Sequence, residues 1–256
     1  MMHSGPVASI SACTSTSTEN DPTGLAIQLT ANADDILFVQ TRTHAWLPAL
    51  RSEETDSRHV AFVQLDGMEI ALWRDDLGAL NAWENRCPHR GTRLTIGANT
   101  GVELVCRYHG WKFASGTGVC TAIPAHPGRP APRAARVLTY ACSEKYGLIW
   151  VRVGDAGDEL SIPQLQGRAA TTLRSVAFSA PAAAVADALR REAATAIIHQ
   201  PRAAGSARVI LLVVPQDEAS SVVHGIIDTE LRSHERMPAL RAVNDRLKRV
   251  RSSVEP

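Results

Sequence analysis

The chain has 256 residues, 45% of them hydrophobic, and its formal net charge is +1 at pH 7. This length fits one large domain or two smaller ones. The balanced charge gives the whole chain no preference for nucleic acid or an anionic membrane, and no apolar run approaches the roughly 20 residues that cross a bilayer. Because the N-terminal sequence also lacks the features of a signal peptide, we expect a cytoplasmic protein that binds neither nucleic acid nor membrane.

Two domains are expected after a flexible N-terminal arm. Residues 1–33 are rich in Ser, Thr, Asn and Asp and should form that arm, since they cannot bury enough apolar surface to fold. Residues 35–154 contain short β-type runs separated by turn residues such as Asp66-Gly67, which is typical of antiparallel hairpins. The four prolines of residues 122–136 predict an extended surface connection there.

Residues 158–256 have a different pattern and predict a small α+β domain. A strand is expected within residues 173–180, and a helix should begin just before Pro181 and end before Pro201. Two strands should flank a turn at 216–219. A final amphipathic helix is indicated by apolar residues at helical spacing, namely Leu240, Val243, Leu247 and Val250.

Two clusters of Cys and His carry the chemical information. Cys87 and His89 form C-x-H, and after 16 residues Cys106 and His109 form C-x-x-H. Two thiolates and two imidazoles suit a tetrahedral structural zinc ion, and they also suit an iron-sulfur cluster with mixed ligands. Five cysteines is an odd number, so a disulfide scaffold is the poorer explanation; Cys13, Cys120 and Cys142 are expected to be free thiols.

The flanking residues favour the iron-sulfur cluster. The sequences CPHRGT (87–92) and CRYHGW (106–111) resemble the two ligand loops of Rieske proteins. That resemblance implies a Rieske-type [2Fe-2S] cluster in which Cys87 and Cys106 bind one iron and His89 and His109 bind the other. Gly91 and Gly110 suit loops whose backbone must turn closely around a cluster.

The wider sequence resembles Rieske proteins of the ring-hydroxylating oxygenase type. It is most similar to the extra N-terminal Rieske region on the reductase components of methylxanthine (caffeine-type) N-demethylase systems. This implies a mainly β fold, in which a Rieske-type antiparallel β domain precedes a small α+β remnant of an oxygenase catalytic domain.

The remnant lacks a recognisable site for a second, mononuclear iron. Terminal oxygenases bind that iron with two histidines and a carboxylate. His199 could stand for the second histidine, but the residue five positions earlier is Ala194. His224 has no ligand type at two-residue spacing, and His234 has only Glu230 and Glu235 nearby.

Three hypotheses follow. The first is an electron-transfer component that passes electrons from a separate NAD(P)H-dependent reductase to a terminal oxygenase subunit, with a hetero-oligomer as one arrangement. The second is a terminal Rieske oxygenase, a demethylase or hydroxylase, with an atypical iron site. The third is a non-catalytic assembly subunit. The first predicts a positive face for an acidic partner, formed by Arg86, Arg90, Arg93 and Arg107, although these arginines could equally hold the ligand loops.

Overall fold

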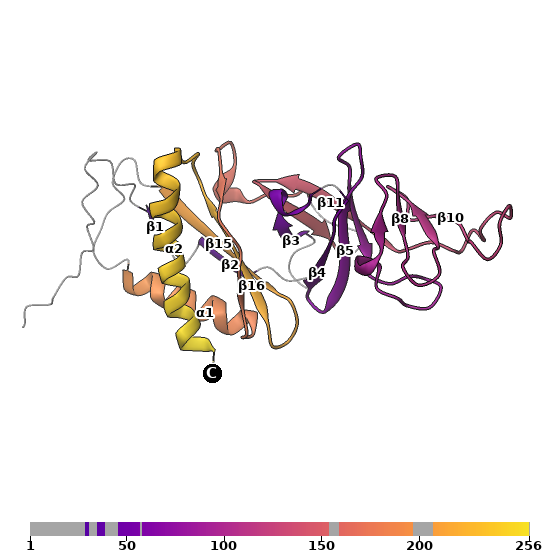
Figure 1. Ribbon diagram of the computed structural model, residues 1–256. Coiled ribbons are helices and arrows are strands. Elements are labelled where there is room, and N and C mark those ends of the chain that lie inside the picture. The colour runs from indigo at the N-terminus through magenta and orange to yellow at the C-terminus, as the bar shows by residue number, and fades with distance from the viewer. Residues whose placement is uncertain are drawn as a thin grey trace, which may run out of the picture.

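The computed structural model describes residues 29–30, 35–38, 46–56, 58–153, 159–196 and 207–255. Two parts lie side by side: a β-rich part at one end and a sheet covered by helices α1 and α2 at the other (Figure 1). Most of the expected arm, together with Cys13 and His199, lies outside the described residues. None of the helices in the described part is long and apolar enough to cross a membrane.

The β-rich part is built on a six-stranded antiparallel sheet. Its strand order is β3-β12-β11-β6-β5-β4. The hairpin joining β4 to β5 turns at Asp66 and Gly67, with φ of 48° and 82°, as the two-residue turn predicted from the sequence requires. The strands are β3 (Trp46–Arg51), β4 (Val60–Leu65), β5 (Met68–Arg74), β6 (Leu80–Glu84), β11 (Thr139–Lys145) and β12 (Leu148–Arg152); a short 3-10 helix, η2 (Ser52–Glu54), follows β3.

A second, four-stranded sheet carries both Cys-and-His motifs. Its strands are β7 (Ala98–Asn99), β8 (Glu103–Val105), β9 (Lys112–Ala114) and β10 (Cys120–Ala122), in the order β10-β9-β8-β7. The first motif lies between β6 and the 3-10 helix η3 (Leu94–Ile96), and the second joins β8 to β9. Buried aromatic side chains, Trp73, Trp83 and Phe113, fill the core between this sheet and the larger one.

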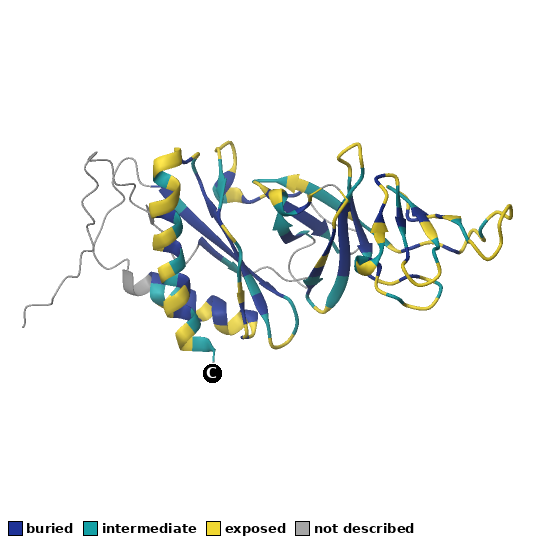
Figure 2. Cartoon of the chain, in the orientation of Figure 1, coloured by how far each residue is buried: buried dark blue, intermediate teal, exposed yellow. Residues whose placement is uncertain are grey.

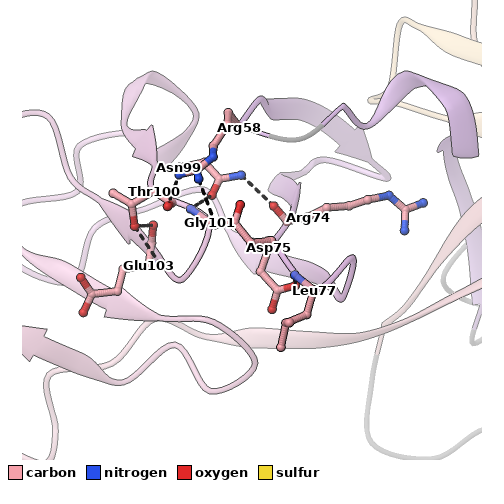
Figure 3. A network of polar contacts seen from close by, with 9 residues as sticks. Arg58, Arg74, Asp75, Leu77, Asn99, Thr100, Gly101 and Glu103 are labelled. Atoms are coloured by element: carbon pink, nitrogen blue, oxygen red, sulfur yellow. Dashed lines mark hydrogen bonds and ion pairs between the residues drawn. The ribbon is translucent and has the colours of Figure 1, made fainter.

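A seam of hydrogen bonds fixes the small sheet onto the large one (Figure 3). The backbone N–H of Asp76 donates to the Gly101 carbonyl at 2.7 Å, and the Asn99 amide donates to the Arg74 carbonyl at 2.8 Å. Arg58 crosses the seam, pairing with the Asp76 carboxylate at 2.9 Å and also donating to the Thr100 carbonyl. Gly101 has φ of +90°, which favours glycine, and a Cβ there would lie 2.1 Å from the Asp76 carboxylate and would displace it from the seam.

The C-terminal part is a sheet centred on two long antiparallel strands, β15 and β16, and it lies between the two helices and the large β sheet. Helices α1 (Ala182–Ala196) and α2 (Ser233–Val254) cover one face of the sheet. The other face, which includes Ile210, Leu212 and Ile226, shares a core with the large β sheet, and Figure 2 shows buried strands in both parts. The strands are β13 (Thr171–Thr172), β14 (Val176–Phe178), β15 (Ala207–Pro215) and β16 (Ser221–Ile227), after a 3-10 helix, η4 (Pro163–Leu165).

The elements expected here from the sequence are present. Helix α1 begins directly after Pro181, and β15 and β16 flank the turn at 216–219. In α2 the predicted stripe is core, since Val243, Leu247 and Val250 are buried and Leu240 packs against the same cluster. This stripe is therefore not an exposed surface for a partner.

The N-terminal strands differ from the sequence prediction. Strands β1 (Leu29–Thr30) and β2 (Ile36–Phe38) pair in parallel with β15 of the C-terminal sheet. The segment from residue 35 was expected in the β-rich domain, and residues 29–30 in a flexible arm. The apolar run of β2 has no features that indicate its partner, and the edge of a long buried strand such as β15 offers unpaired backbone groups to it.

Candidate functional site

The two motif loops have nearly the same backbone hydrogen bonds. The N–H of Cys87 donates to the carbonyl of Thr92, and the N–H of Cys106 donates to that of Trp111, both at 2.8 Å. Each loop is closed again by a glycine, because the N–H of Gly91 donates to Cys87 and that of Gly110 to Cys106, at 2.8 and 3.0 Å. The loops are therefore matched halves of one site.

The four candidate ligands form two pairs at different depths. Cys87 and Cys106 are each 2% exposed and belong to the core beneath the small sheet. The imidazole rings of His89 and His109 lie with their centroids 4.7 Å apart, His89 half-buried and His109 exposed. The thiols thus lie at the base of the site and the imidazoles at its surface.

Aromatic rings contact both imidazoles. Trp111 stacks on His89 with a centroid distance of 4.6 Å and an interplanar angle of 7°. Tyr108 lies against His109 at 3.8 Å, and its side chain is 59% exposed. Sequence reasoning did not assign these contacts, although the aromatic residues flanking the second histidine were the signal for them.

The donor set fits a cationic cluster. Burial, together with the neighbouring Cys106 thiol, raises the pKa of the Cys87 thiol to about 11, while backbone N–H groups of His89 and Arg90 favour its thiolate. The Cys87 thiol would therefore lose its proton near neutral pH only beside a balancing positive charge, which a bound metal provides. A zinc ion would need all four donors in one shell, whereas a thiol pair and a separate imidazole pair suit the two irons of a [2Fe-2S] cluster.

A third segment lies beside the two loops. Ile123 and Ala131, from the proline-rich connection, pack against the core that contains both thiols. Pro124 lies next to Gly110, where a Cβ would come 3.0 Å from the Pro124 ring. Gly110 has φ of +67°, so glycine is favoured there by its backbone conformation as well as by this close approach.

The arginines near the loops have two different roles. Arg93 forms an ion pair with Glu69, with a 2.9 Å Nε to Oε2 hydrogen bond, and its guanidinium lies 5.8 Å from the Phe62 ring centroid. It therefore holds the first loop onto β5 and β4. Arg86, Arg90 and Arg107 are exposed and have no ion pair within the described residues.

The described C-terminal part does not assemble a mononuclear iron site. His224 is buried in β16, and its Nδ1 lies 2.8 Å from the Ser175 hydroxyl. His234 is exposed at the start of α2. Among the described residues, no group of three or more His, Cys, Asp or Glu side chains could hold a single metal ion.

Comparison with known proteins identifies the β-rich part. The family model for the Rieske [2Fe-2S] domain matches residues 45–140. The oxidoreductase NdmD of Pseudomonas putida is 51% identical over 150 residues, covering 57% of this chain and 26% of that protein. The methylxanthine N1-demethylase NdmA of the same species is 32% identical over 139 residues, covering 52% of this chain and 39% of that protein. The chain thus spans roughly a quarter to two-fifths of the length of these relatives.

Solved structures share the fold over most of this chain. NdmA of Pseudomonas putida CBB5 matches with a TM-score of 0.62 at 21% identity, over 81% of this chain and 79% of that one. Apo dicamba monooxygenase matches with a TM-score of 0.64 at 19% identity, over 85% and 86%. Residues 45–140 therefore belong to the Rieske [2Fe-2S] domain family, whose cofactor is a Rieske-type [2Fe-2S] cluster, within a mainly β chain.

Proposed function

We propose that this chain is a one-electron carrier of a multicomponent oxygenase or N-demethylase system. The observation that carries the proposal is the depth of the four donors, with two thiols buried in the core and two imidazoles paired at the surface. When bound, a Rieske cluster accepts and releases one electron at a time. A buried thiol end and an exposed imidazole end would bring the redox-active side close to a partner protein.

The residues have distinct proposed roles. Cys87 and Cys106 would hold one iron from the core, and His89 and His109 would hold the other at the surface. Trp111 would fix the orientation of the His89 ring by stacking on it. The carrier would act in the cytoplasm between a separate NAD(P)H-dependent reductase and a terminal oxygenase.

A second candidate is a terminal oxygenase with an atypical mononuclear iron site, because the fold likeness to NdmA extends beyond the Rieske domain. That function needs a third iron. His224 is a poor ligand for it, since the side chain is 1% exposed and, among the described residues, it belongs to no group of three or more His, Cys, Asp or Glu side chains that could hold a metal ion.

The iron content of anaerobically purified protein tests both candidates. We expect two irons and two acid-labile sulfides per chain, with only a reduced Rieske EPR signal after dithionite. A third iron with a high-spin ferrous centre that binds nitric oxide would contradict the carrier and support the oxygenase.

Single cysteine variants test the ligand assignment in the same assay. Cys87→Ala should lose the cluster signal. Cys120→Ala is the matched control, because Cys120 is also buried in the core that contains Cys87 and Cys106 but lies outside the motifs. Equal loss in both variants would mean that the signal reports the integrity of the core rather than ligation.

A further inference from the structure

The charges of this chain are unevenly distributed. Lys and Arg number 27 and Asp and Glu 26, yet the sequence from Leu104 to Ser143 contains no acidic residue. The same segment contains five basic side chains, namely Arg107, Lys112, Arg129, Arg133 and Arg136. It includes the second ligand loop and the proline-rich connection, so no acidic side chain of this segment offsets its positive charge at the cluster end.

The basic side chains of this segment are largely unpaired. Arg107, Arg129 and Arg133 are exposed, and none has an ion pair within the described residues. Elsewhere in the structure arginines commonly contact carboxylates: Arg74 pairs with Glu144 at 2.7 Å, and Arg246 pairs with Glu192 at 2.8 Å. The guanidinium groups near the cluster are thus available to an external carboxylate.

The proline-rich connection forms an arm beside the ligand loops. We use that name for residues 123–136, which project from the end of the molecule far from α1 and α2 and are mostly exposed (Figures 1 and 2). Hydrogen bonds at the base of the arm join Cys120 to Ala135 and Val137 to Gly118, both at 2.9 Å. Four prolines limit its conformations. The arm therefore presents Arg129 and Arg133 without a large entropic cost on binding.

We infer that Tyr108, Arg107 and the arm with Arg129 and Arg133 form the docking face for an acidic electron-transfer protein. This inference rests on the proposed carrier function and names the kind of partner that its exposed end would meet. Tyr and Arg, together with Trp, are enriched among the side chains that dominate binding energy at protein interfaces. A patch of exposed positive charges also increases the association rate with a negatively charged partner.

An acidic protein fits this face better than a nucleic acid. Single-stranded nucleic acid binding uses several aromatic rings on which successive bases stack. At the cluster tip, among the described residues, one aromatic side chain, Tyr108, is more than half exposed. The net charge of the whole chain is also only +1, which gives it no general attraction for a polyanion.

The test is stopped-flow reduction of the cluster-loaded protein by an acidic plant-type [2Fe-2S] ferredoxin, reduced beforehand, over a range of ionic strength. For the unaltered protein we expect a second-order rate constant that falls as salt rises. The double variant Arg129→Glu with Arg133→Glu should lower the constant at low salt by about tenfold or more and flatten its salt dependence.

The matched control is Arg241→Glu with Lys248→Glu, which makes the same charge change on exposed positions of α2. This control should react nearly as fast as the unaltered protein, and the reduction potential should be equal in all three proteins. An equal loss in the control, a salt-independent rate for the unaltered protein, or no reduction by the ferredoxin would overturn the inference. So would binding of single-stranded DNA that the arm variant alone abolishes while ferredoxin reduction is unchanged.

Failure of the carrier proposal would be distinguishable from failure of this docking face. In that case the purified protein would show no dithionite-reducible Rieske EPR signal, before any stopped-flow measurement. A protein that has that signal but shows none of the expected dependence on Arg129 and Arg133 would retain the proposed function and lose only this docking face.

Discussion

The two histidines have unequal surroundings, although the loops that present them have matching hydrogen bonds. His89 is half-buried and stacked on Trp111, whereas His109 is exposed beside Tyr108. Desolvation, with smaller effects from His109 and Arg90, lowers the pKa of His89, which favours the neutral imidazole that binds metals. One imidazole is thus held in place and the other is presented to solvent.

Replacing one imidazole by a thiolate tests the assignment of the surface pair. His109→Cys should keep a cluster but lower its reduction potential, because a third thiolate adds negative charge. The potential should shift from the Rieske range, about −150 to +300 mV, toward the roughly −400 mV of all-cysteine clusters. An EPR-monitored redox titration measures it. His126→Cys, an exposed histidine of the arm, is the control, and equal potentials in the two variants would refute His109 as a ligand.

The sequence was informative about the motif residues because their chemistry is local. C-x-H and C-x-x-H with their glycines predicted two similar loops, and the structure has them. The role of Arg93 was not predictable, since its partner Glu69 lies 24 positions away. The sequence left open whether Arg93 binds a partner or holds the loop, and the ion pair with Glu69 shows that it holds the loop.

At the scale of elements, the two loops differ in how closely another segment approaches them. Gly91 and Gly110 both have positive φ, +72° and +67°. A Cβ on Gly91 would meet no atom within 4 Å, whereas one on Gly110 would lie 3.0 Å from Pro124. The second loop is therefore the more constrained of the two.

This difference predicts unequal effects of the same substitution. Gly91→Ala should cost about 1 kcal/mol from its backbone conformation alone, and Gly110→Ala should cost more because the base of the arm must also shift. Cluster occupancy, measured from iron and sulfide per chain after equal purification, should be lower in Gly110→Ala. Equal occupancy in the two variants would argue against a tight packing of the arm on the second loop.

Strand pairings between neighbours in the sequence were predictable, whereas a pairing between distant segments was not. The hairpin at Asp66-Gly67 and the pair β15 and β16 were expected, because alternation and turn residues are local signals. The pairing of β2 with β15 was not expected, since the two strands are about 170 positions apart and a three-residue apolar run has no register of its own. The partner and register of such a strand are set by tertiary contacts, which local sequence does not reveal.

At the scale of the whole molecule, His224 lies where the two parts meet. It belongs to β16, and Pro48, Arg51 and Glu54 face it from β3 and η2. Burial lowers the pKa of His224 to about 4, with Arg51 acting in the same direction and Glu54 opposing it. The neutral side chain is therefore part of the contact between the sheets.

The depressed pKa gives a definite sign to the pH dependence of stability. In the unfolded chain His224 takes up a proton near pH 6.5, but in the folded protein it resists protonation down to about pH 4. The free energy of unfolding should therefore fall as pH decreases from about 6.5 to 4, by up to about 3 kcal/mol. Carboxylates with lowered pKa, such as those of Glu54 and Asp75, change the free energy of unfolding only below about pH 4.5. Most of the change between pH 6.5 and 4 should therefore come from His224.

Thermal unfolding midpoints at pH 7.5 and 5.5 measure this effect. His224→Gln should lose stability at pH 7.5 and show a smaller drop between the two pH values than the unaltered protein. His234→Gln, on an exposed position of α2, should match the unaltered protein at both. An undiminished drop in His224→Gln would assign the pH dependence to other groups.

The parallel pairing of β2 with β15 makes the Rieske part an insertion within the C-terminal sheet. During synthesis, every strand partner of the Rieske part has been made once β12 ends at Arg152, while β2 still waits for β15. The inserted part can therefore close first, and the sheet that contains β2 is completed only after β15 and β16 have been made. After folding, the Rieske part is tied at both of its ends to one sheet, by β2 before it and by β13 after it, so it cannot move away from that sheet without disturbing both attachments.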